Sequence, residues 1–344
     1  MRLESEERFL AKLLFSGLIL LFSLLVAYLK PVGFDVDSHA YYLMTINQDV
    51  ILNFEGNQEP IFKLIRAALF IITDDLYRAL LVTYMFLAIS LKLYLVQRFS
   101  RCYAISIFAY ISIYFLLHDV IQMRAALAAA VFMWSLPDLA EKNRRYIYKI
   151  ALASICHYSS LFLFPLYLLN FGKIKKTNYY FFYILTLIIS SQYNIILDLA
   201  TNISGILPGV FGYKAQRYLV LINQDVHTSY NLLNIYNLSL IFISLILIWK
   251  SSDQYSNFDN MIVKVLAVSN YIYITMSAIP VLAARVSELM AITVVFALAI
   301  IYHFSRFKLL TMVIIMGYLS CVFYINYFLK TYINTDLIKG FYFL

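Results

Sequence analysis

The chain is organised as long apolar blocks separated by short polar stretches. Blocks such as 9–29, 232–249 and 309–329 approach the roughly 20 residues that a helix needs to cross a bilayer. A soluble core would instead place its apolar residues on one face of each helix or on alternate positions of each strand. We therefore expect an all-α polytopic membrane protein.

The apolar blocks predict about ten to twelve transmembrane helices. A further apolar segment at 61–73 follows Pro60 and is too short to span, so it could lie on the membrane or dip into it. No internal repeat or linker divides the chain, and residues 1–344 are expected to form a single membrane domain. The spanning candidates lie at 9–29, 77–97, 103–117, 120–137, 147–170, 179–197, 232–250, 261–281, 285–303 and 308–330.

Composition and charge agree with this class and orient it. Charged residues are 13% of the chain, about half of the roughly 25% found in soluble domains. The net charge of +8 comes from Lys and Arg in short loops, which the positive-inside rule places in the cytoplasm. It is therefore a topology signal, and no nucleic-acid partner is expected. The basic loops contain Arg98 and Arg101, Arg144 and Arg145, and Arg306 and Lys308.

Two longer stretches are expected on the external side. Residues 31–60 contain neither Lys nor Arg and carry five acids. This loop reads as external, so the N-terminus is expected to be cytoplasmic and the chain to lie in a bacterial inner (plasma) membrane, among its lipids. The second external loop is expected at 198–231, provided that the segment before it enters and leaves the membrane on one side.

That segment, 147–170, has basic residues at both ends. Either it is one straight helix that violates the charge rule locally, or two short halves meet near His157 and form a hairpin. We favour the hairpin, because a broken helix is tolerated at membrane depth where it lines a cavity. An ordinary hydrogen-bonded histidine inside the helix bundle would explain His157 equally simply.

Candidate chemistry rests on isolated polar residues, because the phosphate-binding and hydrolase motifs of soluble enzymes are absent. Arg124, Arg217 and Arg285 are all expected at the external face, where arginine is unusual. A diphosphate ligand would explain the three together, since guanidinium binds phosphate oxygens through two parallel hydrogen bonds. Individually, Arg124 could extend to the lipid headgroups, Arg217 could be a solvated loop residue, and Arg285 could pair with Glu288.

The first external loop adds acids and an imidazole. A carboxylate of this loop, or the imidazole of His39, could deprotonate a sugar hydroxyl as general base. Asp35 and Asp37 could together hold a divalent cation, although acidic pairs are frequent in exposed loops. No resident metal or other cofactor is expected.

These pieces, in this order, resemble the EpsG/Wzy family of bacterial polysaccharide polymerases. The resemblance departs at the C-terminus, where 334–344 lacks the Pro-Tyr ending of many relatives. The similar motifs are Asp37 to Tyr42, Glu59-Pro60-Ile61-Phe62, Gln122 to Ala128, His157-Tyr158-Ser159-Ser160-Leu161, Arg217-Tyr218 and Arg285.

The resemblance implies a GT-C-like membrane glycosyltransferase. It would join undecaprenyl-diphosphate-linked oligosaccharide repeats, as donor and acceptor, at the periplasmic face and release undecaprenyl diphosphate. The product would be O-antigen (lipopolysaccharide), capsule or exopolysaccharide, and a chain-length regulator would be a partner. Arg124, Arg217 and Arg285 would neutralise the leaving diphosphate. The general base would be Glu59, His157 or Asp37. Sugar-binding residues would be Tyr41, Tyr42, Gln122, Tyr158 and Tyr218.

Three other classes compete with a polymerase. An O-antigen ligase uses the same donor but carries a larger late external loop than 198–231. A flippase or other secondary transporter commonly shows two related halves, which are not visible here, although a mid-segment His157 would suit it. A structural assembly subunit would not need three external arginines.

Overall fold

The computed structural model describes residues 2–35, 37–46, 58–170, 172–206 and 234–330, with side chains from residue 9, and the isolated positions 212, 216, 219 and 220. Within these ranges all regular structure is helical and no strand occurs. The expected all-α polytopic membrane class is therefore confirmed.

Five helices in the described ranges are long and apolar enough to cross a membrane. Two bent pairs raise the number to seven: α9 (Lys176–Ser190) with α10 (Tyr193–Ile206), bent by 82°, and α14 (Pro280–Ala291) with α15 (Val294–His303), bent by 45°. The five are the apolar part of α1 (Arg2–Leu29), α5 (Leu76–Phe99), α6 (Tyr103–Tyr110) continued by η1 (Ile111–Ile121), α7 (Met123–Ala140), and α16 (Lys308–Tyr324) continued by η3 (Ile325–Leu329).

Five to seven spans are fewer than the expected ten to twelve segments, and the difference has local causes. The apolar block at 147–170 is divided, and α12 (Ile235–Lys250) is shorter than a full span. Both predicted external loops also contain helix: α2 (Ser38–Ile46) lies within the first, and α10 extends into the second as far as Ile206. Sequence patterning missed these because a short apolar run at a loop boundary suits either state.

The predicted break near His157 is present. An α-helix, α8 (Arg145–Cys156), ends one residue before His157, and a 3-10 helix, η2 (Tyr158–Leu168), begins one residue after it. The start of α8 then meets the end of η2: Tyr146 donates from its hydroxyl to the Leu163 carbonyl at 2.6 Å, and its ring stacks on Tyr167 with centroids 6.0 Å apart. The first turn of α8 therefore packs against η2, and entry and exit on one side of the membrane stays a prediction.

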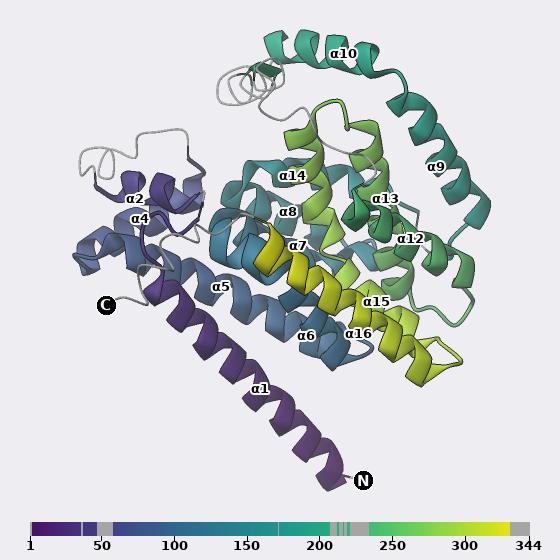
Figure 1. Cartoon of the computed structure of the whole chain (residues 1–344), viewed down its shortest axis with the longest axis horizontal. Coiled ribbons are helices and arrows are strands. Elements are labelled where there is room, and N and C mark those ends of the chain that lie inside the picture. Colours follow the sequence, from purple (N-terminus) through teal and green to yellow (C-terminus); the bar gives the residue numbers. More distant parts are fainter. Residues whose placement is uncertain are drawn as a thin grey trace. The chain divides into compact units, whose positions relative to one another are not determined.

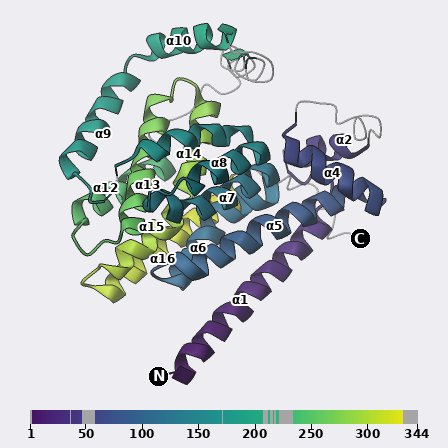
Figure 2. The same ribbon diagram turned by 180° about the vertical axis from the view of Figure 1, so that it is seen from behind.

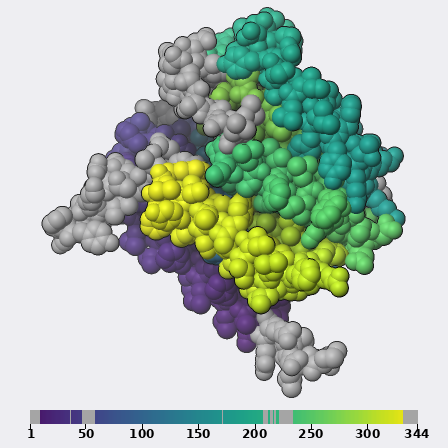
Figure 3. Space-filling view, turned by 45° about the vertical axis from the view of Figure 1, so that its right-hand side comes forward, coloured from purple at the N-terminus to yellow at the C-terminus, as the bar shows by residue number. Residues whose placement is uncertain are grey.

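The chain packs as two compact units. Unit 1 comprises residues 1–135, 148–158 and 298–344, and it includes α4 (Pro60–Ile72). Helix α1 lies along α5 (Figures 1 and 2) and reaches the start of α6, where the Ser16 and Tyr103 hydroxyls lie 2.7 Å apart. Helix α16, yellow in Figure 3, packs on α6 and η1 with its outer face exposed.

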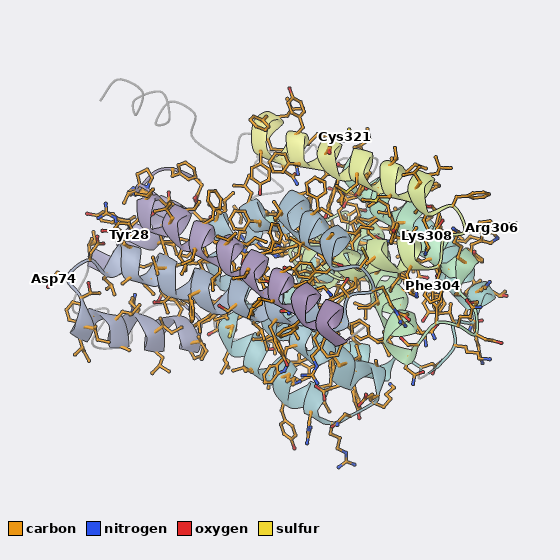
Figure 4. All side chains as sticks on the ribbon, turned by 90° about the horizontal axis from the view of Figure 1, so that it is seen from below. Tyr28, Asp74, Phe304, Arg306, Lys308 and Cys321 are labelled. Atoms are coloured by element: carbon orange, nitrogen blue, oxygen red, sulfur yellow. The ribbon has the colours of Figure 1, made fainter. Side chains whose placement is uncertain are left out.

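Unit 1 has two chemically different ends. Tyr28 and Asp74 lie at one end, and Phe304, Arg306 and Lys308 lie at the other (Figure 4). The Arg101 guanidinium lies 5.9 Å from the centre of the Phe304 ring. The basic loops at 98–101 and 306–308 therefore share one end of the unit, as their charge pattern predicts.

Unit 2 comprises residues 136–147 and 159–297. Its centre is α13 (Asn257–Thr275), against which α9, α12 and α14 pack. Helix α13 begins with a capping box in which the Ser256 and Asp259 side chains satisfy each other's backbone N–H groups. Buried Asn270 on α13 donates to the Tyr183 hydroxyl of α9 at 2.9 Å.

Candidate active site

A buried carboxylate marks the start of α4. Glu59 immediately precedes Pro60, and proline at the first helical position favours helix initiation because its φ is preset and it lacks an N–H. Glu59 has extended backbone angles (φ −65°, ψ 148°), and its side chain does not cap its own helix. The side chain is instead fully buried, so it needs other partners.

Those partners are the arginine and the histidine of two other motifs. Arg124 donates from Nη1 to Glu59 Oε2 at 2.5 Å, and His157 Nδ1 lies 3.1 Å from Glu59 Oε1. Arg124 stands in the first turn of α7, and His157 stands at the junction of α8 and η2. Residues that are 65 and 98 positions from Glu59 thus converge on its two oxygens.

Two aromatic rings hold the Arg124 guanidinium. Its central carbon lies 5.5 Å from the Tyr41 ring centre and 5.4 Å from the Phe62 ring centre, within the range of a cation–π interaction. The Arg124 side chain keeps 22% of its surface exposed, and its Nε has no hydrogen-bond acceptor among the described residues. Nε is buried, so a further anionic group could approach only the exposed part of the Arg124 side chain.

The Glu59 carboxylate stays ionised. Burial raises its pKa, but the hydrogen bond with His157 and the positive charge of Arg124 outweigh burial and lower the pKa to about 2. An ionised carboxylate only accepts hydrogen bonds, so Nδ1 of His157 carries the proton in this contact. The other ring nitrogen, Nε2, is then the one that can accept a proton.

The predicted sugar-binding tyrosines divide between two environments. Tyr41 is buried against Arg124, so its ring face is already occupied. Tyr42 is partly exposed and packs edge-on against Tyr77 with ring centres 6.0 Å apart. Tyr158 lies beside His157, and its hydroxyl donates to the Gln58 carbonyl at 3.5 Å. Gln122 occupies the break between η1 and α7 (φ −98°, ψ 57°).

The acidic pair of the first loop forms a turn. Lys30 Nζ lies 2.5 Å from Asp35 Oδ2 in a buried ion pair. The other oxygen, Asp35 Oδ1, accepts from the N–H groups of Asp37 and Ser38 at 3.0 and 2.9 Å. Within the described ranges no three His, Cys, Asp or Glu side chains are grouped as metal ligands. A cation at Asp35 and Asp37 would have to displace Lys30.

The other two predicted arginines are placed differently. Arg285 is exposed on α14, in unit 2. Arg217 and the neighbouring Tyr218 lie outside the described residues. The predicted joint action of three arginines on one diphosphate therefore stays a prediction, and Arg124 is the one that contacts Glu59.

Sequence reasoning missed a second buried charge cluster in unit 1. Lys92 donates to both oxygens of Asp119, at 2.7 and 2.9 Å, and Tyr110 donates to Asp119 Oδ2 at 2.7 Å. The signal was available, because a lysine within the apolar run of α5 is costly in a membrane and needs a partner. Arg66 of α4 was missed as well: it is buried and donates to the Met44 carbonyl at 3.0 Å.

Fold and site together define a multi-pass helical membrane protein with a buried, charged constellation of glutamate, arginine and histidine. The chain matches the EpsG family over residues 12–339 and belongs to it, a family of polysaccharide polymerase-like membrane proteins. The matched range contains every motif on which the resemblance was based. No curated protein and no solved structure gave a significant match to the chain.

Proposed function

We propose that this protein is a glycosyltransferase of GT-C type that polymerises oligosaccharide repeats linked to undecaprenyl diphosphate. It would act at the external face of the inner membrane and release undecaprenyl diphosphate at each transfer. The observation that carries the proposal is the convergence of Glu59, Arg124 and His157 in a member of the EpsG family.

The proposed reaction exchanges one bond at the anomeric carbon of the donor sugar. The bond from this carbon to the diphosphate oxygen breaks, and a bond to an acceptor hydroxyl oxygen forms. The hydroxyl proton passes to His157 Nε2 acting as general base. The diphosphate leaves with the bonding electrons, and Arg124 stabilises the charge that develops on it.

The geometry supports His157 over Glu59 as the base. A general base works best when its pKa lies near the operating pH, and the pKa of Glu59 is lowered to about 2 by His157 and Arg124 despite its burial. Glu59 suits the role of a fixed acceptor that orients the imidazole, as carboxylates do in other catalytic dyads. Asp37, in the turn before α2, remains an alternative base.

The arrangement of unit 1 supports an external site. Residues 103–121 form one span between the basic loop at Arg101 and the start of α7 at Arg124. If basic loops are cytoplasmic, Arg124 lies at the external end of this span and the N-terminus is cytoplasmic. A lipid-linked substrate would then be met after it has been moved across the membrane.

Deletion of the gene, with surface polysaccharide separated on a gel, tests the function. A polymerase predicts loss of the ladder with survival of a single-repeat band. Loss of all bands would contradict it and indicate a flippase or a ligase. Complementation with Arg124→Ala should fail to restore the ladder, whereas Arg78→Ala, which removes an exposed arginine of the same unit, should restore it.

A further inference from the structure

The span before Arg124 contains an unusually long π-helix. Residues Tyr103–Tyr110 form an α-helix, and the eleven residues Ile111–Ile121 that follow form the π-helix η1. π-helices are rare, occur mostly as single turns and are often found at functional sites. Here η1 ends at Gln122, and Arg124 follows in the first turn of α7.

One hydrogen bond depends on this π winding. Tyr110 and Asp119 are nine residues apart. In an α-helix of 3.6 residues per turn this is about two and a half turns, which puts the two side chains on opposite faces. In a π-helix, whose i→i+5 hydrogen bonds close a turn every four to five residues, it is about two turns, and the side chains share a face. The 2.7 Å contact from the Tyr110 hydroxyl to Asp119 Oδ2 therefore depends on the segment being wound as a π-helix.

Lys92 fixes the same carboxylate from a neighbouring helix. Its ammonium lies 2.7 and 2.9 Å from the two oxygens of Asp119, and both side chains are completely buried. Breaking such a pair would leave an uncompensated charge in an apolar surrounding, which is strongly destabilising. Asp119 is thus tied to α5 through Lys92 and to α6 through Tyr110.

Side chains also satisfy main-chain carbonyls at both ends of η1. At its start, Tyr327 donates to the Ile111 carbonyl at 2.9 Å and Asn326 donates to the Ser112 carbonyl at 3.0 Å. At its end, Lys30 donates to the Val120 carbonyl at 2.5 Å. Buried carbonyls need such partners, so elements distant in the sequence support this particular winding.

We propose that Tyr110, Lys92 and Asp119 are positioning residues for Arg124, because they hold η1 in its π register. A return to α winding would carry Asp119 away from Tyr110 and turn the start of α7 about the helix axis. The Arg124 guanidinium would then leave Glu59. This inference deepens the proposed function, on which its catalytic consequence rests, but the position of Arg124 can be measured without any activity.

The first test measures the reactivity of Arg124 directly. Purified full-length protein is treated with phenylglyoxal, which modifies accessible arginines, and each arginine is quantified by peptide mass spectrometry. Labelling of Arg124 should rise several-fold in Tyr110→Phe. The same rise is expected when Lys92→Met and Asp119→Leu are combined, a change that removes both charges at once and so avoids an unpaired one.

The matched control is Tyr183→Phe in unit 2. It removes another buried tyrosine hydroxyl, which is hydrogen-bonded to Ser244 at 2.8 Å, and it should leave Arg124 labelling unchanged. Unchanged labelling in Tyr110→Phe would overturn the positioning role. So would an equal rise at the buried Arg66, which would indicate general loosening of the unit.

The second test is a double-mutant cycle on polymer synthesis in membranes. Tyr110→Phe should lower the rate by about tenfold to a hundredfold, the cost of a small displacement of a catalytic group. In an Arg124→Lys background, which keeps the positive charge but not the guanidinium, Tyr110→Phe should cause a much smaller further loss, since coupled residues are not additive. A full additional loss would show an independent effect and contradict the inference. If the wild-type protein makes no polymer, the proposed function fails, while the labelling result still decides the positioning.

Discussion

Arg124 and Glu59, 65 residues apart, form an ion pair 2.5 Å long at the start of α4. The second oxygen of Glu59 contacts His157, so one buried carboxylate joins a cationic group to an imidazole. This pairing changes what each residue can do. The carboxylate fixes the Arg124 guanidinium and the Nδ1 edge of the imidazole, and in the proposed mechanism Arg124 stabilises the leaving group while His157 takes the proton.

The charge on Glu59 should make stability depend on pH in a defined window. The pKa of Glu59 is lowered from 4.5 to about 2 in the folded protein, where His157 and Arg124 outweigh the effect of burial. A lowered folded-state pKa contributes stability above the unfolded-state value, and this contribution is lost as the pH falls from about 4.5 towards about 2. The measurement is the thermal unfolding temperature of purified protein from pH 7 to pH 3. This temperature should decrease once the pH is below about 4.5.

The variant Glu59→Gln should remove this dependence. It should lower the free energy of unfolding at pH 7 by about 1–3 kcal/mol, because it leaves Arg124 without its counter-charge. The difference in the free energy of unfolding between the variant and the wild type should shrink as the pH approaches 3. As a control, Glu141→Gln makes the same change at an exposed glutamate, and it should leave the profile unchanged. A difference that is constant with pH would mean that Glu59 is not the titrating group.

His157 should be required for the transfer step. Replacing it by alanine removes the proposed proton acceptor, and general-base catalysis typically contributes about 10²–10⁴-fold. Polymer formation in membranes should fall by at least about 100-fold, with the single-repeat species still present. His303→Ala, which removes an imidazole packed edge-on against Phe304, should retain the ladder. If the His157 variant made normal polymer, His157 would not be the general base, and Asp37 would be the remaining candidate.

Replacing Phe62 should lower activity by more than the loss of its packing alone would explain. Phe62→Leu keeps an apolar side chain but removes a ring that faces the Arg124 guanidinium, an interaction of about 0.5–2 kcal/mol. Polymer synthesis should fall by about threefold to thirtyfold. Phe132→Leu makes the same change at another fully buried position of the unit, and should show a comparable loss of thermal stability with little loss of activity. Equal activities in the two variants would indicate that the ring does not assist Arg124.

The two ends of unit 1 should face opposite sides of the membrane. In a variant without the native cysteines Cys102, Cys156 and Cys321, single cysteines can be placed at the exposed positions Asp74 and Phe307. A membrane-impermeant thiol reagent added to intact spheroplasts should label the cysteine at 74. The cysteine at 307 should be labelled only after permeabilisation. The reverse pattern would place the site in the cytoplasm and contradict the proposed function.

Apolar block length and loop charge, which are local properties of the chain, were enough to predict a helical membrane protein, the break at His157 and the shared end of the basic loops at 98–101 and 306–308. The motif residues Glu59, Arg124 and His157 could also be named from the sequence. Their mutual contact could not be predicted, because it depends on which distant helix ends are brought together. The same holds for the pairing of Lys30 with Asp35.

Tertiary structure alone decided the winding of η1. An apolar run such as 103–121 has the same hydrophobicity whether it is wound as an α-helix or a π-helix. The choice between them rests on small differences in backbone energy. Here side chains of Tyr110, Lys92 and Tyr327, from three other elements, meet η1 and stabilise one winding. The sequence of the run does not reveal such long-range contacts. Its hydrophobicity does reveal its tendency to enter a membrane.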